Sequence, residues 1–223
     1  TEFPPLPNIQ INTYSAEIVD EPKIKGYLEI YQGDDKIEEH NIGIEIRGSS
    51  SQFFDKKSYG FETWDEEGED LNVSLAGYPE EEDWILYGPF SDKSLIRNVL
   101  IYNLSNQIGR YATKTKFYNL TINNEFLGVY VLMEKIKRDK NRVDISKNKP
   151  EDISGGYIIK IDKSTGDGDS FNSDIAFISE YTSGGIKGLN KNPTFLYEYP
   201  KNEDISDYQN EYIQNYILGV ENS

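Results

Sequence analysis

The chain has no cysteine and only one histidine. The lack of cysteine excludes disulfides and thiolate zinc sites. The histidine, His40, lies in a polar run ahead of a strand-like segment, where a solvated surface position is favoured over a catalytic one. Nucleophilic triads, which need a histidine or a comparable base beside the nucleophile, are therefore not expected.

Long apolar runs and an excess of positive charge are also missing. No stretch approaches the roughly 18 apolar residues that a membrane span needs. Thirty-nine acidic residues against 23 basic ones give a net charge of −16, which repels nucleic acid and anionic membranes unless a local patch reverses the field. No Walker loop is present, and no pair of carboxylates is marked out for glycoside hydrolysis, although that chemistry stays open. Anion binding is the chemistry that the pattern favours.

Aromatic residues are abundant, with 17 tyrosines and 10 phenylalanines among 223 residues. They supply enough buried area for a folded core despite a hydrophobic fraction of only 36%. The length suits one domain, or two small lobes around one cleft. Because the first residue is Thr1 and not Met, we expect a trimmed chain from which any export signal has been removed.

The stretch 42–63 is predicted to form a β-hairpin, with basic residues where its loop joins the two strands. Both ends alternate as strands do, and the loop between them holds Gly48 and three serines that begin at Ser49. Arg47 ends the first strand, and Lys56 and Lys57 begin the second. Backbone amides flanked by cations are suited to polyphosphate. The alternatives to an anion site are an ordinary turn at the glycine and lysines that are simply exposed to solvent.

Ser91 or Asp92 is predicted to cap a helix that continues to about Ile108 and is ended by Gly109. Its apolar face is expected to consist of a row of residues spaced by four, with Leu95 and Val99 beside them: Ile96, Leu100, Leu104 and Ile108. Lys93 and Arg97 fall in its first turns, where cations oppose the helix dipole. Either the acidic run 80–83 or a bound phosphate could offset them.

Other elements follow from alternation and turn residues. Strands are expected at 8–14, 25–31, 84–87, 116–122, 126–133, 155–162 and 177–181, and a second helix at 207–218. Asn123 and Asn124 are expected to form a hairpin turn.

Basic residues follow Glu134 and form either a solvated face or the rim of a cleft: Lys135, Lys137, Arg138, Lys140 and Arg142. Calcium at Asp162, Asp167 and Asp169 is disfavoured, because the EF-hand spacing is not met.

Five sequence segments, which occur in the same order, resemble segments of the spore coat CotH family of atypical protein kinases. They are 44–49 (IEIRGS) with 56–59 (KKSY), 84–86 (WIL) with 92–98 (DKSLIRN), 126–134 (FLGVYVLME), 155–162 (GGYIIKID), and 199–200 (YP) with a helix around Tyr212. The resemblance implies an α+β, protein-kinase-like fold with a mainly antiparallel sheet and one packed helix. It also implies ATP and Mg²⁺ as cofactors and a protein substrate phosphorylated on Ser or Thr.

The resemblance also implies roles for single residues. Lys56 or Lys57 would contact phosphate under a lid formed by the 42–63 hairpin. The residues themselves, without the resemblance, already indicate the rest of an anion cradle: Arg47, Gly48, Ser49, Lys93 and Arg97. Glu134 would end the strand that leads into the adenine-binding hinge. We expect residues 1–223 to be one domain, with about 1–134 resembling the N-lobe and 135–223 the start of the C-lobe.

The family's catalytic aspartate and its Trp-Asp-x-Asp metal-binding block have no counterpart in this sequence. Phosphoryl transfer depends on positioned Mg²⁺ and an acidic residue. We therefore expect the C-terminal part of the domain to lie beyond Ser223, and this chain to be inactive alone. The alternative is a non-catalytic interaction domain of a spore coat or secreted assembly. Either way the expected location is extracellular or on a cell or spore surface.

Overall fold

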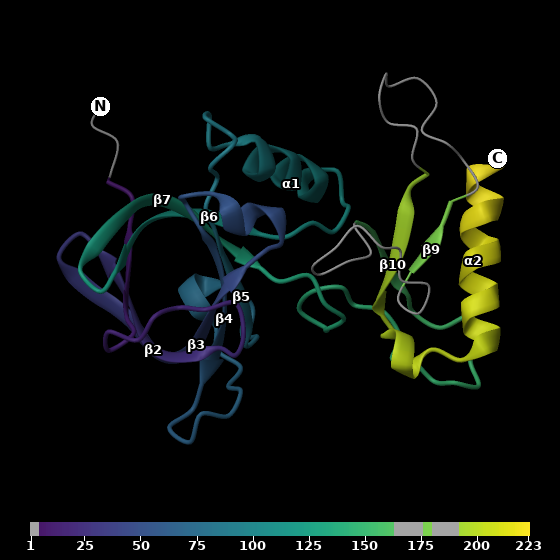
Figure 1. Cartoon of the computed structure of the whole chain (residues 1–223), viewed down its shortest axis with the longest axis horizontal. Coiled ribbons are helices and arrows are strands. Elements are labelled where there is room, and N and C mark those ends of the chain that lie inside the picture. Colours follow the sequence, from purple (N-terminus) through teal and green to yellow (C-terminus); the bar gives the residue numbers. More distant parts are fainter. Residues whose placement is uncertain (1–4, 163–175, 180–191) are drawn as a thin grey trace. The chain divides into compact units, whose positions relative to one another are not determined.

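The computed structural model describes residues 5–162, 176–179 and 192–223. The chain divides into two compact units, Thr1–Ile136 and Lys137–Ser223, which we call the barrel unit and the C-terminal unit (Figure 1). None of the helices in the described residues is long and apolar enough to cross a membrane.

The barrel unit is a closed barrel of seven strands in the order β1-β2-β3-β4-β5-β7-β6 (Figure 1). Neighbouring strands are antiparallel, except that β1 and β6 run parallel where the ring closes. The strands are β1 (Asn8–Asn12), β2 (Ile24–Gln32), β3 (Asp35–Arg47), β4 (Ser58–Trp64), β5 (Asp83–Tyr87), β6 (Thr115–Ile122) and β7 (Glu125–Glu134). The structure thus confirms the α+β class and the expected hairpins, while the closed barrel was not predicted.

The barrel interior is filled by side chains from every strand. Alternate residues face inward, as the period of two in a strand requires. The fully buried members include Ile9, Leu28, Ile42, Ile44, Phe61, Trp84, Leu120, Tyr130 and Leu132. The predicted Asn-Asn turn is confirmed, with φ of 48° at Asn123 and 67° at Asn124, the left-handed pair that a two-residue hairpin turn needs. Short 3-10 turns occur at η1 (Ser50–Phe53) and η2 (Leu75–Gly77).

Helix α1 (Arg97–Gln107) packs on the outside of the barrel. Val99 and Tyr102 contact a small cluster formed by Ile85, Val131 and Met133. The predicted start at Ser91 or Asp92 was wrong, because the backbone turns at Leu95 with φ of 65° before the helix begins.

The predicted apolar face of this helix was right at Val99, which contacts the barrel, and wrong for the row of residues spaced by four. Its members are 46–76% exposed: Ile96, Leu100, Leu104 and Ile108. Because Val99 and Tyr102 make the contact with the barrel, this four-residue row lies on another side of the helix.

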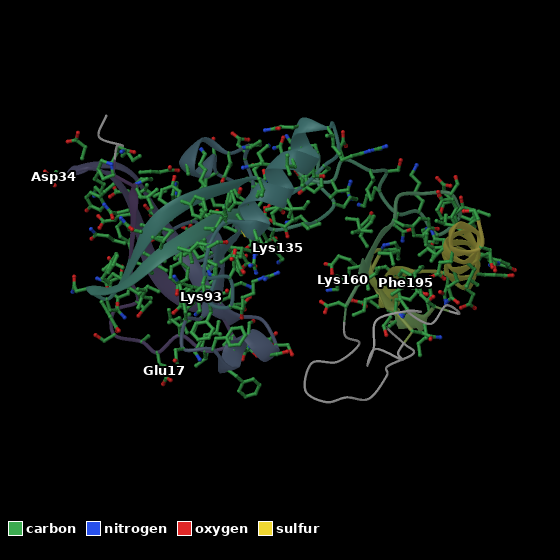
Figure 2. All side chains as sticks on the ribbon, turned by 90° about the horizontal axis from the view of Figure 1, so that it is seen from above. Glu17, Asp34, Lys93, Lys135, Lys160 and Phe195 are labelled. Carbon is green, nitrogen blue, oxygen red and sulfur yellow. The ribbon has the colours of Figure 1, made fainter. Side chains whose placement is uncertain are left out.

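The C-terminal unit is a three-stranded antiparallel sheet with one helix against it. The strand order is β8 (Ile158–Ile161), β10 (Thr194–Tyr199), β9 (Ala176–Ile178), followed by η3 (Asn202–Asp204) and α2 (Asp207–Glu221). Its core joins Phe177, Phe195 and Tyr197 to Ile213 of α2 (Figure 2 labels Phe195). The strand expected at 155–162 is confirmed over Ile158–Ile161. The strand expected at 177–181 is confirmed as β9, which ends at Ile178, and residues 180 and 181 lie outside the described residues. Strand β10 was not predicted. The loop expected at 163–169, with Asp167 and Asp169, lies outside the described residues.

Gln209 ties α2 to the rest of this unit. It is fully buried, and its Nε2 donates to Asn148 Oδ1 at 2.6 Å and to the carbonyls of Lys149 and Asp152 at 2.9 and 3.0 Å. Its Oε1 accepts from the amide of Ser206, which completes a capping box at the start of α2.

We predict that Gln209→Ala lowers the free energy of unfolding by about 2 kcal/mol, because several buried polar groups lose their partner at once. Chemical denaturation followed by circular dichroism measures this change. The matched control is Asn215→Ala on the exposed side of α2, which should change stability by less than about 0.5 kcal/mol. Equal effects of the two substitutions would contradict the assignment.

Candidate functional site

The β3–β4 loop is a compact turn with a fixed backbone. Arg47 pairs with Ser58 at the last position of the ladder, and η1 occupies the tip of the loop. Gly48 has φ of 121°, and a Cβ added there would lie 2.0 Å from Ser51 Oγ, so only glycine suits this position. Gln52 Nε2 donates to the Gly48 carbonyl at 2.6 Å and to Asp20 Oδ1 at 2.7 Å. Ser49 is exposed at the start of the turn.

Lys57 stabilises this loop from within. Its Nζ donates to the carbonyls of Gln52 and Phe54 at 2.6 and 2.7 Å. These carbonyls have no partners in a regular helix or sheet, so the ammonium replaces the missing donors. These hydrogen bonds give Lys57 a structural role in stabilising the loop.

Lys56 points away from the loop and onto β7. Its Nζ donates to the Val129 carbonyl at 2.6 Å and lies 4.6 Å from the centroid of the Tyr130 ring. A Cβ added to Gly88 would lie 3.1 Å from Lys56 Cγ, and one added to Gly128 would lie 3.8 Å from Lys56 Nζ. Glycines from two other strand regions thus leave room for this side chain.

Burial lowers the pKa of the Lys56 ammonium. Among the described residues, no carboxylate forms an ion pair with it. Its only hydrogen-bond partner there is the Val129 carbonyl. Lys56 is therefore a partly desolvated cation that lacks a negative counter-ion within the part of the chain that the structure describes.

Lys93 lies beside the same loop through an aromatic contact. Phe54 of the loop stacks on Phe90 with ring centroids 4.9 Å apart. Lys93 Nζ lies 4.6 Å above the Phe90 ring and donates to the Phe90 carbonyl at 2.9 Å (Figure 2 labels Lys93). Lys93 precedes α1 and is not in the helix, which corrects the prediction that it lies in the first turns of the helix together with Arg97.

Asp92 offsets the positive charge at the start of α1. Its carboxylate accepts from the amides of Ser94 and Arg97 at 3.0 and 2.9 Å and lies 3.6 Å from Arg97 Nε. The Ser94 hydroxyl, the Arg97 amide and the Arg97 charge lower the pKa of Asp92. Neither the run 80–83 nor phosphate is needed for Arg97, whose side chain is 79% exposed.

Arg47 and Glu134 have surroundings different from those of Lys56. Arg47 is exposed on the outer face of the hairpin, where its Cβ lies 3.9 Å from the place of a Gly60 side chain. Glu134 is fully buried at the end of β7 and accepts from the Lys114 amide at 2.9 Å and from Lys114 Nζ at 3.4 Å. Five residues of strand separate it from Val129, or about 16 Å. Glu134 thus does not form a cluster with Lys56, and Arg47 faces outward from the sheet.

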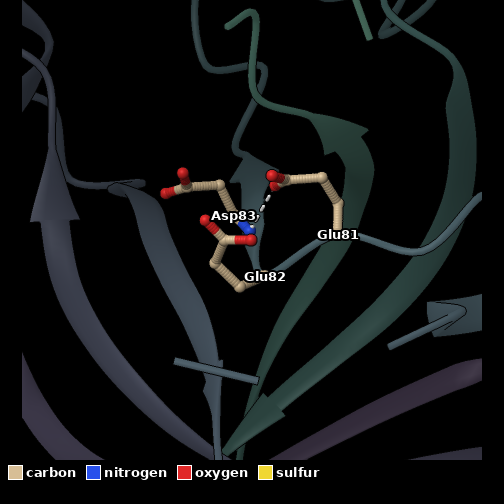
Figure 3. Close-up of side chains that lie close together, drawn as sticks. All are labelled: Glu81, Glu82 and Asp83. Carbon is tan, nitrogen blue, oxygen red and sulfur yellow. Dashed lines mark hydrogen bonds between the residues drawn. The ribbon is translucent and has the colours of Figure 1, made fainter. Parts of the chain in front are cut away.

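Three carboxylates gather just before and at the start of β5: Glu81, Glu82 and Asp83 (Figure 3). One oxygen of each lies within 4.8 Å of the others. Glu81 Oε2 accepts from the Asp83 amide at 2.8 Å, and Asp83 Oδ1 accepts from Lys135 Nζ at 2.7 Å. Of the described residues, these are the ones with the spacing of metal ligands. Gly88, near Lys56, lies five residues further along, or about 16 Å away, so this group does not face Lys56.

The basic run after Glu134 has no single environment. Lys135 is paired with Asp83, Lys140 is exposed, and Arg142 is 4% exposed. The boundary between the two units falls inside the run, after Ile136. These basic residues therefore do not share one environment in the described structure. Neither expectation, a single solvated face or the rim of a cleft, is confirmed for the run.

We predict a pH dependence that belongs to Lys56. Its pKa in the folded state lies below the unfolded value of 10.5, so folding penalises the charged form. The penalty is present at neutral pH and disappears as the pH rises through the folded pKa towards 10.5. Relative to Lys56→Met, the wild-type chain should therefore gain stability as the pH is raised from neutral to just above 10.5.

Denaturation of both proteins across this range measures the difference, in which the ionisation of the tyrosines cancels. Lys25→Met, at an exposed lysine of β2, is the control and should follow wild type. A constant difference between wild type and Lys56→Met would show that Lys56 is not desolvated.

Comparison with known proteins agrees with the resemblance seen in the sequence. The family model described as CotH kinase protein matches residues 44–223. No curated protein matches the chain. The match begins in β3, takes in the hairpin loop with Lys56 and extends through α2. The chain belongs to the CotH kinase family.

Proposed function

We propose that this chain binds ATP as part of a CotH-type protein kinase, with Lys56 as the phosphate-contacting lysine. The observation that carries the proposal is the environment of Lys56. Its ammonium is partly buried where the loop, the end of β5 and β7 meet, and a single carbonyl accepts from it. A phosphate oxygen carries a full charge and would be a stronger acceptor than that carbonyl.

The neighbouring lysine fits this role less well. Moving Lys57 to a phosphate would break two hydrogen bonds to the loop. Moving Lys56 breaks one, and it relieves a burial penalty. Lys93, held beside the loop by the Phe54–Phe90 stack, would add a second charge. The Gly48 turn, with Ser49 exposed at its start, would act as the lid.

The order of elements supports the kinase-like reading of the barrel unit. A hairpin with the covering loop is followed by β5, then α1, then the β6–β7 hairpin that ends at Glu134. In this reading the barrel unit is the N-lobe, Lys137–Ser223 begins the C-lobe, and Glu134 leads into the hinge. The usual lysine–glutamate pair of protein kinases has no counterpart in α1, which contains no acidic residue.

The described residues do not supply a Mg²⁺ site next to Lys56. The clustered carboxylates lie at the opposite end of β5, and no Trp-Asp-x-Asp sequence occurs among the 223 residues. We therefore propose that this chain alone binds nucleotide without transferring phosphate. Phosphorylation of Ser or Thr of a protein substrate is proposed for the parent protein. A surface location, as in the spore coat, is proposed from the family.

We predict that ATP stabilises the wild-type chain and that Lys56→Met removes this effect. At one hundred times the dissociation constant, binding adds about 2.7 kcal/mol to the free energy of unfolding. Thermal shift with and without ATP measures the gain within each variant, so a change in basal stability does not interfere. Lys25→Met should keep the full gain. A gain that survives in Lys56→Met would contradict the role of this lysine.

We predict phosphoryl transfer by the longer parent protein and not by the 223-residue chain. Labelled ATP with a generic Ser/Thr protein substrate, and with the chain itself as acceptor, measures the transfer. Lys56→Met in the parent should reduce it at least about a hundredfold, the scale on which positioned charges contribute to catalysis. Robust transfer by the short chain would overturn the division proposed here.

A second candidate, a non-catalytic interaction domain, is favoured by α1. Its exposed apolar row (Ile96, Leu100, Leu104 and Ile108) is the kind of surface that binds other proteins. An absence of any ATP-induced stabilisation in the wild-type chain would favour this candidate over nucleotide binding.

A further inference from the structure

The outer face of the β3–β4 hairpin carries an open hollow of about 620 Å³. It is lined by three carboxylates, one ammonium, an indole and a proline: Glu45, Glu62, Glu21, Lys23, Trp64 and Pro22. The hollow is separate from the Lys56 site, because residues facing out of the barrel line it. It is also independent of the proposed nucleotide binding.

Missing side chains shape the floor of this hollow. Gly43 of β3 and Gly60 of β4 lie diagonally across the ladder from each other, beside Glu62 and Glu45. A Cβ on Gly43 would lie 1.9 Å from Cζ2 of Trp64, so the indole lies on the strand where a side chain would otherwise stand. A Cβ on Gly60 would lie 3.2 Å from Glu45 Oε1. The two glycines thus hold an aromatic wall and a carboxylate close to the sheet.

The charges in the hollow are not balanced. Lys23 Nζ lies 3.3 Å from Glu45 Oε1 and 2.9 Å from Glu62 Oε1. Burial opposes the charge of Lys23, but hydrogen bonds and charges from Glu62 and Glu45 outweigh it and raise its pKa. One ammonium shared by two carboxylates, with Glu21 nearby, leaves an excess of two negative charges at the wall formed by Trp64.

We propose that this hollow binds a lysine or arginine side chain from an extended basic segment of a partner protein. A cation placed on the indole gains a cation–π interaction, and the carboxylates supply charge-assisted hydrogen bonds. A neutral sugar could stack on the indole but would leave the excess charge unneutralised. An open hollow suits a side chain from a strand passing over it better than an enclosed small molecule.

The fluorescence of Trp64 provides a direct readout. The chain has two tryptophans, and the other, Trp84, is 1% exposed inside the barrel. The probe is a capped hexapeptide of alternating glycine and lysine, titrated to about 1 mM. We expect a saturable change in emission that weakens as salt is raised.

The peptide with every lysine acetylated, which keeps the length and loses the charge, should bind at least about tenfold more weakly. Spermidine separates a free polyamine from a peptide side chain, and maltotriose tests the sugar alternative. Binding by the sugar or the acetylated peptide that equals binding by the basic peptide would overturn the proposal. So would spermidine binding tighter than the peptide, or no response to the peptide.

The variant Glu45→Gln with Glu62→Gln should weaken peptide binding at least about tenfold. The matched control, Asp34→Asn with Glu203→Gln, removes the same two charges at exposed positions outside the hollow and should change affinity by less than about twofold. Equal losses in both variants would mean that the peptide senses only the net charge of −16.

Calorimetry on Trp64→Phe, which lacks the fluorescence signal, should show weaker binding of the peptide. An unchanged affinity in this variant would exclude a role of the indole in binding.

Discussion

Closure of the barrel is the constraint on which the described features of the first unit depend. β1 pairs with β2 on one side and, in parallel, with β6 on the other, so the ring has no free edge. Each strand must then place alternate residues in a filled interior. The remaining residues face outward, and they are available for function only there or at the loops. The β3–β4 hairpin uses both places.

The contrast between Lys56 and Lys57 follows from this constraint. Consecutive residues entering a strand point to opposite sides, so adjacent lysines cannot share one ligand with equal ease. Lys57 meets the carbonyls of its own loop, and Lys56 meets β7 across the end of the barrel. Tyr130 connects the two, since its hydroxyl donates to the Lys57 carbonyl at 2.9 Å while Lys56 lies over its ring.

Local patterns predicted the hairpins, because both strands and the turn of a hairpin lie within a short stretch. The β3–β4 and β6–β7 pairs were found from alternation and from Asn123 and Asn124. The closed barrel could not be read in the same way. It depends on β1 meeting β6, more than a hundred residues later, and no local pattern records that contact.

The error at α1 has a different physical cause. A row of apolar residues spaced by four indicates a face but not whether that face is covered. Here Val99 and Tyr102 reach the barrel, and the longer row stays exposed. Asp92 was one of the two predicted capping residues, and it does accept from the Arg97 amide, the first amide of α1, although the helix begins later than predicted. Strand β10 could have been found from its aromatic residues between Pro193 and Pro200.

The residues of the candidate site were named from the sequence, but their arrangement was not. The sequence identified the cations of the loop, but it could not separate the two lysines or place Arg47 on the outer face. These positions depend on which carbonyls and glycines the barrel brings near each side chain: Val129 for Lys56, Gln52 for Lys57 and Gly60 for Arg47.

One hairpin therefore presents opposite charges at two places. The loop end carries lysines. The outer face carries Glu45 and Glu62, with Arg47 on the same face at the end next to the loop. Five residues of β4 separate Glu62 from Lys57, or about 16 Å, which exceeds the Debye length of about 8 Å at physiological salt. The two fields are thus largely independent, so the proposed anion site at the loop and the proposed cation site on the outer face are compatible with each other in a chain whose net charge is −16.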